Sequence, residues 1–220
     1  MDIFASGIPN IRIKNYGTRR KPLEIIEATI VLEAWDGYLN KRWENAKVIT
    51  DGTIKLDFGG YNPNIPRDWQ PEINAYHHLM QNQYEIRDNI IRSLIEKFDW
   101  LKETYDWDQD DDITPETKAD FNFKPFIGTQ SLSFSEESKN DISYLEWLFY
   151  CVWDEEHGLA VTTHQERVID LDRGETDIWK IYEDKGTLAE ELKEYEERVK
   201  NFKPMKNFKP KSRKPWWQFW

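Results

Sequence analysis

Cysteine is almost absent from this chain of 220 residues. Cys151 is the only one, so no disulfide can form within the chain and no cysteine pair can hold a zinc ion. The chain also lacks a run of 18 apolar residues, and its first residues do not resemble a secretion signal. These absences favour a cytoplasmic protein with one buried thiol.

The common catalytic and phosphate-binding motifs are missing as well. There is no glycine-rich phosphate-binding loop, no H-E-x-x-H zinc motif and no G-x-S-x-G nucleophile elbow. We therefore predict no catalytic residue, no resident metal and no cofactor. The favoured class is a non-enzymatic protein.

Basic residues are scarce over most of the chain. Residues 1–200 carry all 41 acidic residues and 24 of the 30 basic ones, a net charge of −17, while residues 201–220 carry six basic residues and no acidic one. Such an acidic body argues against nucleic-acid binding, which needs positive surface. It favours a basic protein partner through electrostatic steering. The alternative, that acidity only keeps the protein soluble, stays open at this point.

Residues 23–58 have the pattern of an antiparallel meander. Apolar and polar residues alternate along Leu23–Trp35. Asp36-Gly37 is a two-residue hairpin signal that leads to the next strand, and Asp51-Gly52 is a second one. The polar residues 1–22 are expected to be irregular. The apolar side of the first strand consists of Ile26, Ala28, Ile30, Leu32 and Ala34.

A helical pattern runs from Pro71 to about residue 103. Proline suits the first turn of a helix. His77 and His78 are adjacent, so they cannot both face one ligand from a helix, and we interpret them as surface or boundary histidines. The predicted apolar stripe, interrupted by Arg87, consists of Ile73, Tyr76, Leu79, Met80, Tyr84, Ile90, Ile91, Leu94, Ile95, Phe98 and Leu101.

The densest apolar alternation lies in Leu145–Leu171 and predicts a central hairpin. Its first strand is expected to end at Trp153, followed by a five-residue loop, Asp154–Gly158, in which Gly158 adopts a positive φ. The second strand is expected over 159–164 and a third from Arg167. The predicted register pairs Trp153 with Leu159.

The loop and the following strand contain the chain's best constellation for chemistry. Two histidines and three carboxylates could hold a divalent metal or transfer protons, which suggests a metal-dependent hydrolase centred on residues 154–164. The predicted register, however, places His164 opposite Leu148 and away from the loop. The favoured interpretation is that the loop satisfies its own backbone groups and contacts a partner. The constellation is Asp154, Glu155, Glu156, His157 and His164.

Two stretches resemble a bacterial family of domains of unknown function. One is C-V-W-D-E-E-H-G-L-A-V at 151–161, followed by H-Q-E-R-V at 164–168, and the other is the helix at 71–91. Ala160 stands where the family more often has a second glycine. The resemblance covers roughly residues 23–182. It implies a small α+β protein without an established activity, some relatives being encoded near toxin or conflict genes.

A second amphipathic helix is predicted after residue 187. Thr187 and Glu190 have the spacing of a capping box. The apolar stripe that follows, up to Pro204, consists of Leu188, Leu192, Tyr195 and Val199.

Residues 201–220 form a basic and aromatic tail. The motif Asn-Phe-Lys-Pro occurs twice in it, and the prolines exclude a continuous helix. So many aromatic side chains need a surface to cover them, either the acidic body of the chain itself or a partner's pocket. A membrane is less favoured, because anionic lipid would repel the acidic body. The terminal aromatic residues are Trp216, Trp217, Phe219 and Trp220.

These patterns together predict an α+β protein whose antiparallel sheet packs on one long helix. Its parts are an irregular segment at 1–22, a single domain at 23–200 and the tail. The favoured function is a protein-binding module, for example an immunity protein that occludes a basic toxin or conflict-system effector. The hydrolase and an adaptor acting through the tail are the alternatives. The predicted partner-binding residues are Asp154, Glu155, His157, Trp216, Trp217, Phe219 and Trp220.

Overall fold

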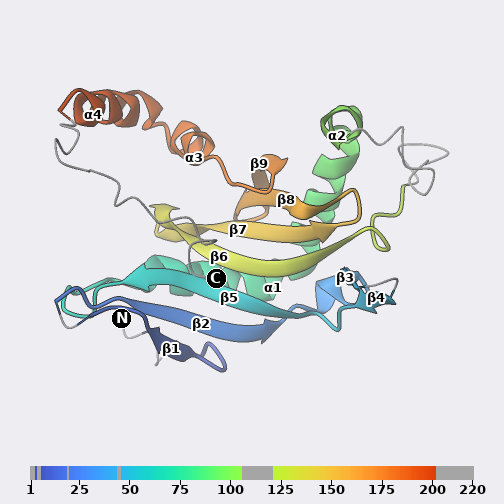
Figure 1. The fold of residues 1–220 in the computed structure, drawn as a ribbon, viewed down its shortest axis with the longest axis horizontal. Helices are drawn as coiled ribbons and strands as arrows, with labels where there is room; N and C mark the ends of the chain where they lie inside the picture. Colours follow the sequence, from blue (N-terminus) through green and yellow to red (C-terminus); the bar gives the residue numbers. More distant parts are fainter. Residues whose placement is uncertain (1–2, 4–5, 19, 44–45, 106–120, 202–220) are drawn as a thin grey trace, which may run out of the picture. The chain divides into compact units, whose positions relative to one another are not determined.

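The computed structural model describes residues 3, 6–18, 20–43, 46–105 and 121–201, with only the backbone of 40–43, 46–48 and 155. These residues form a seven-stranded sheet, a separate two-stranded sheet and helices, which confirms the α+β class (Figure 1). The chain divides into two compact units after Ile181.

The large sheet is mixed rather than purely antiparallel. Neighbouring strands are antiparallel, as predicted, except for β5 and β6, which are parallel. The parallel pair follows from the connection, because two helices separate these strands in the sequence and supply the crossover that parallel strands require. The strand order is β1 (Arg12–Asn15), β2 (Glu24–Val31), β5 (Thr53–Tyr61), β6 (Ile127–Lys139), β7 (Ile142–Cys151), β8 (Asp154–His164) and β9 (Arg167–Arg173).

The predicted N-terminal meander is wrong in its pairing. Strand β2 pairs with β5, while β3 (Leu39–Trp43) and β4 (Ala46–Ile49) pair with each other outside the large sheet. The first hairpin signal is preceded by a 3-10 turn, Glu33–Trp35, which buries Trp35 completely. The Leu32 N–H donates to the Gly52 carbonyl (2.8 Å). This hydrogen bond closes the base of the segment between β2 and β5, which contains the 3-10 turn, β3 and β4.

The N-terminal segment, expected to be irregular, contains the edge strand β1. It pairs antiparallel with β2, so that the backbone of β2 is hydrogen-bonded on both sides. The Lys14 ammonium lies 2.6 Å from the Glu27 carboxylate of β2. Sequence pattern missed this strand because all four of its residues are exposed and no apolar alternation marks it.

The predicted long helix is two helices, α1 (Gln70–Glu96) and α2 (Phe98–Tyr105), with Pro71 in the first turn as expected. Asn82 has non-helical φ and ψ, and its side-chain amide donates to the His78 carbonyl (2.9 Å). Such side-chain bonding within a helix accompanies bends. The predicted stripe is wrong at Tyr84, which is half exposed, whereas Ile86 is fully buried.

The core lies between α1 and one face of the sheet, and α1 runs behind the strands in Figure 1. Trp147 of β7 is 1% exposed, and its indole N–H donates to the Thr163 hydroxyl (2.9 Å). The predicted apolar side of β2 and its continuation is confirmed. Residues with at most 2% exposure there are Ile26, Ala28, Ile30, Leu32 and Ala34.

Strand β7 is buried on both faces, as its aromatic alternation predicted. Leu145, Trp147 and Phe149 belong to the core. Tyr144 and Tyr150 lie on the opposite face, called the outer face below, and are also buried. This strand carries Glu146 of the pocket described in the next section, and its last residue, Cys151, lies beside the polar cluster described there.

The turn of the central hairpin is Val152–Trp153, so the predicted five-residue loop is wrong. Cys151 pairs with Asp154, and Phe149, not Trp153, pairs with Leu159. Leu148 therefore faces Ala160 rather than His164. Strand β9 follows β8 as the predicted third strand.

Two features explain where the turn lies. Trp153 packs edge-on against Tyr105 of α2 and Phe123, with ring centroids 6.1 and 6.3 Å apart. The residues after Asp154 form a bulge in β8, in which Gly158 has the predicted positive φ of 73°. A Cβ atom on Gly158 would lie 2.4 Å from the Phe149 carbonyl oxygen, so a side chain there is excluded.

Helices α3 (Ile178–Lys185) and α4 (Leu188–Asn201) end the described chain. Gly186, with φ 81°, separates them, and the Thr187 N–H donates to the Tyr182 carbonyl (2.9 Å), as at a glycine-ended helix. The predicted capping box is wrong, because the Thr187 hydroxyl has no hydrogen-bond partner among the described residues.

Candidate functional site

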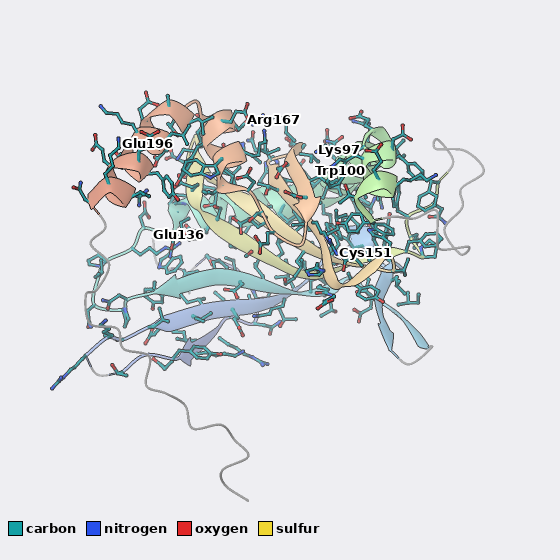
Figure 2. All side chains as sticks on the ribbon, turned by 45° about the horizontal axis from the view of Figure 1, so that its top comes forward. Lys97, Trp100, Glu136, Cys151, Arg167 and Glu196 are labelled. Atoms are coloured by element: carbon teal, nitrogen blue, oxygen red, sulfur yellow. The ribbon has the colours of Figure 1, made fainter. Side chains whose placement is uncertain are left out.

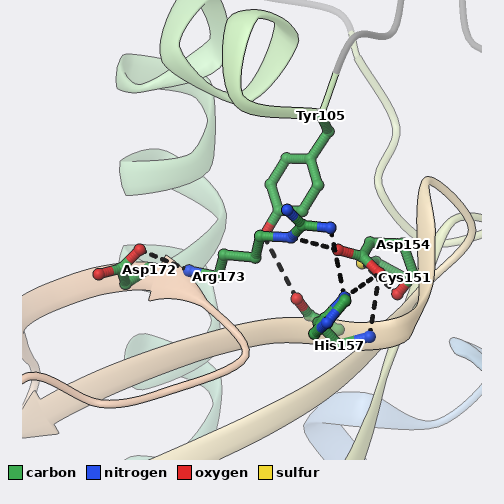
Figure 3. Close-up of polar contacts among 7 residues, drawn as sticks. Tyr105, Cys151, Asp154, His157, Asp172 and Arg173 are labelled. Atoms are coloured by element: carbon green, nitrogen blue, oxygen red, sulfur yellow. Dashed lines mark hydrogen bonds and ion pairs between the residues drawn. The ribbon is translucent and has the colours of Figure 1, made fainter.

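Asp154 is the centre of a polar cluster at the turn of the central hairpin (Figure 3). It opens β8 and is 9% exposed. One carboxylate oxygen accepts the His157 backbone N–H (2.9 Å), and the other accepts the Arg173 Nε–H (2.5 Å). We call Asp154, His157, Arg173 and Tyr105 the hairpin clamp.

The clamp joins three elements that are distant in the sequence. Arg173 is the last residue of β9 and pairs with Leu159 of β8, which brings its guanidinium to Asp154. Tyr105 ends α2, lies with its ring 5.7 Å from the Arg173 guanidinium carbon and donates its hydroxyl to the Gly158 carbonyl (3.2 Å). The clamp therefore fixes α2, β8 and β9 to one another.

The electrostatics of the clamp favour a permanently ionised carboxylate. Burial alone would raise the pKa of Asp154, but hydrogen bonds from the His157 backbone, from Arg173 and from the His157 ring outweigh burial and hold the pKa below its usual range. Burial raises the pKa of the Tyr105 hydroxyl, which stays protonated and donates. The charged pair Asp154–Arg173 is thus present throughout the neutral range.

The His157 ring has two alternative partners. Its Nδ1 lies 3.1 Å from Asp154 Oδ1 and 3.2 Å from Arg173 Nη2. A protonated Nδ1 donates to the carboxylate, whereas an unprotonated Nδ1 accepts from the guanidinium. Half of the His157 side chain is exposed, so the ring forms the solvent-facing side of the clamp.

The thiol beside the clamp is not a nucleophile at neutral pH. Cys151 is fully buried, and its Sγ–H donates to the Asp154 carbonyl (3.5 Å). Burial raises its pKa to about 12, so the thiolate is scarce at neutral pH. In Figure 2, Cys151 lies toward the end of the sheet on the side where Trp100 of α2 is labelled.

The predicted constellation of two histidines and three carboxylates is not brought together. His164 ends β8, far from Asp154 at its start. It is 2% exposed, its Nε2 lies 3.1 Å from the Lys139 carbonyl, and its ring lies 4.6 Å from that of Tyr144. Within the described ranges, no group of three His, Cys, Asp or Glu side chains could hold a metal ion. The predicted surface or boundary positions of His77 and His78 are confirmed, because His77 is exposed and His78 is partly buried.

For five of the predicted partner-binding residues, the side chain lies outside the part of the chain that the structure describes. The Glu155 side chain is not described, and the tail lies beyond residue 201. Asp154 is buried within the clamp, and His157 is exposed beside it. The predicted tail residues outside the described part are Trp216, Trp217, Phe219 and Trp220.

A pocket of about 430 Å³ opens on the outer face of the sheet. Glu146 of β7 stands on its floor, paired in register with Ser133 of β6 and Thr162 of β8. The loop after β9 supplies the other wall. We call this site the Glu146 pocket. Its lining residues are Ser131, Ser133, Glu146, Trp147, Leu148, Ala160, Gly174, Glu175 and Thr176.

Glu146 is a partly buried carboxylate whose hydrogen-bond partners are neutral. Burial raises its pKa, although hydroxyl hydrogen bonds from Ser135, Ser133 and Thr176 oppose the rise. Sequence analysis did not select Glu146. The sequence did contain a signal. Glu146 is the single charged residue in Ile142–Cys151, a strand in which most of the other residues on both faces are apolar.

Comparisons with known proteins add a family but no activity. No helix among the described residues is both long and apolar enough to cross a membrane. No curated protein and no solved structure matches the chain. The family model described as "Domain of unknown function (DUF6985)" matches residues 35–179, more than half of the chain and a range that contains both the hairpin clamp and the Glu146 pocket. The chain therefore belongs to the DUF6985 family.

Proposed function

We propose that the protein is a non-enzymatic binding module whose helix α4 docks into an apolar groove with a basic rim on a partner protein. The apolar stripe of α4 carries this proposal. Leu192, Tyr195 and Val199 are 41%, 49% and 55% exposed, and none of the α4 residues, all of which are described, is buried. Amphipathic helices with anchors at this spacing commonly bind grooves in other proteins.

Charge indicates which kind of groove suits α4. Helical spacing places Glu191 and Glu196 on either side of the stripe, while Lys193 and Glu197 lie on the opposite side. The −17 charge of residues 1–200 adds attraction for a basic protein and raises its association rate. An immunity protein that occludes a basic toxin or conflict-system effector is one form of this proposal.

The hairpin clamp supports binding over the hydrolase alternative. Both Asp154 oxygens are occupied by donors of the protein itself, at 2.9 and 2.5 Å. A general base or metal ligand needs an oxygen that can face substrate or metal. His164, the second histidine of the hydrolase hypothesis, is at the far end of β8. These groups stabilise the hairpin.

The test compares a stripe variant with a matched control. In the stripe variant, Leu192→Ala, Tyr195→Ala and Val199→Ala shorten the apolar side chains and keep a good helix former. In the control, Lys193→Gln and Glu197→Gln alter the opposite side without a change in net charge. Partners are sought by co-purification from the native cells and among the products of neighbouring genes, and each is then purified and its affinity measured by calorimetry.

We expect a purified partner to bind wild type and control equally and the stripe variant roughly tenfold or more weakly, as for loss of central anchors. Equal binding by all three proteins would reject α4 as the docking element. Catalytic turnover that His157→Ala abolishes would favour the hydrolase instead.

A further inference from the structure

We propose that the Glu146 pocket is a binding site for an organic cation, an alkylammonium or guanidinium group of the kind that lysine and arginine side chains carry. The inference goes beyond docking by α4, because every residue that it uses lies between 131 and 176. It rests on the charge, hydrogen-bonding capacity and size of the pocket.

The charge of the lining is negative and uncompensated. Two carboxylates, Glu146 and Glu175, line the pocket, and none of the described lining residues is basic. Glu27, elsewhere on the outer face, is by contrast a compensated carboxylate, because the ammonium groups of Lys14 and Lys55 lie 2.6 and 2.8 Å from its oxygens. No lysine or arginine in the described part of the chain makes such a pair with Glu146. An entering cation would supply it.

The hydroxyl groups around Glu146 match the donors of an ammonium ion. Thr162, directly opposite Glu146 in the β7–β8 pair, is 1% exposed and lies next to the pocket lining without belonging to it, and its hydroxyl has no partner in the described structure. A buried hydroxyl without a partner is costly and is often completed by a ligand or water. Ser133 and Thr176, which donate to Glu146, keep lone pairs that can accept N–H groups from the cation.

The size and apolar part of the pocket fit the stem of a basic side chain. A volume of about 430 Å³ is at the small end of ligand sites. Leu148 and Ala160 provide apolar wall beside the carboxylate. Lysine and arginine bind in this manner, with the methylene stem on apolar surface and the charged head on a polar group.

A second carboxyl group in the same row strengthens the preference for a cation. Asp170 of β9 pairs in register with Thr162, so the row across the sheet is Glu146, Thr162 and Asp170. Burial raises the pKa of both carboxyl groups. Asp170 does not line the pocket, and the charge of Lys97 acts on it and lowers its pKa, so it adds a weaker, longer-range attraction for a cation bound at Glu146.

The experiment titrates the whole chain with small probes and follows backbone amide shifts by NMR. The probes are n-butylammonium, N-acetyl-lysine methylamide and N-acetyl-arginine methylamide, with N-acetyl-norleucine methylamide as the neutral control. The proteins are wild type, Glu146→Gln and Glu136→Gln, the last removing an exposed carboxylate of β6. Thermal unfolding of each variant shows that it is folded.

We expect the cationic probes to shift residues 131–133, 146–148 and 174–176 with a Kd of about 1–20 mM, as for one ion-paired fragment. Glu146→Gln should raise the Kd of the cationic probes roughly tenfold, and Glu136→Gln should leave it unchanged. Binding of butylammonium without either capped amino acid would assign the same site to a free amine. Equal binding of the neutral probe, or unchanged binding to folded Glu146→Gln, would overturn the proposal. Neither outcome depends on the α4 experiment.

Discussion

Asp154 and Glu146 are carboxylates of one β-hairpin, and different groups offset the cost of burying their negative charge. Asp154 receives a guanidinium and a backbone N–H, and its pKa is lowered. Glu146 receives neutral hydroxyls, and its pKa is raised. Burial disfavours the charge in both cases, so the difference comes from the partner.

The comparison separates a structural carboxylate from one available for binding. A carboxylate paired within the chain stabilises the fold and has little left to offer a ligand. A carboxylate buried among hydroxyls without a cation costs stability, a pattern that is frequent at functional sites. The predictions below test this difference through stability.

Among substitutions of the two carboxylates, the largest expected effect is that of Asp154→Ala. The substitution leaves the His157 N–H without its acceptor and the half-exposed Arg173 guanidinium to be solvated by water, so we expect a loss of about 1–3 kcal/mol in the free energy of unfolding. Urea unfolding measures it. Glu156→Ala, an exposed carboxylate of the same strand, is the control and should change stability by about 0.5 kcal/mol or less. Similar small losses in both variants would show that the clamp is not a stabilising element.

Much of the fold follows from periodicity. The alternation along Leu145–Cys151 and the run of apolar residues after Pro71 predicted a doubly buried strand and a long helix, and both are present. These patterns are local, because a strand or helix that packs on a core repeats its apolar residues at its own period.

The pairings could not be predicted in the same way. The sequence Asp154–Gly158 has turn-forming composition, yet the turn is Val152–Trp153, because Trp153 packs against α2 and Asp154 binds Arg173, 19 residues away. Likewise, β5 pairs with β2, although β3 and β4 lie between them in the sequence. Such choices depend on long-range contacts, which no local pattern records.

The second expected effect is a gain in stability, opposite in sign to the loss expected for Asp154→Ala, and it depends on pH. Burial raises the folded-state pKa of Glu146 above 4.5, so its contribution to stability falls as pH rises from 4.5 through the folded pKa. We expect Glu146→Gln to remove this fall and to stabilise the protein by about 0.5 kcal/mol at neutral pH, a modest value because the group is only partly buried. Glu175 in the pocket lining, Asp170 in the same row of the sheet and Lys55 opposite Ser131 are unchanged in the variant.

Asp154 should show the reverse pH dependence. Its folded pKa lies below 3.8, so its contribution is complete above pH 3.8 and is lost as pH falls through the folded pKa. Urea unfolding of wild type, Glu146→Gln and Asp154→Asn over the acidic and neutral range measures both profiles. If the two difference curves slope in the same direction, the contrast between a compensated and an uncompensated carboxylate is wrong.

The smallest expected effect is that of the α4 stripe on folding. Leu192, Tyr195 and Val199 are between 41% and 55% exposed, so changing all three to alanine removes little buried surface, while alanine favours the helix. We expect a change within about 0.5 kcal/mol in urea unfolding. Leu94→Ala in α1, where the side chain is fully buried, should by contrast cost about 2–5 kcal/mol. A loss of more than about 1 kcal/mol from the stripe variant would mean that the stripe stabilises the fold of the chain itself, which would contradict its role as the docking element.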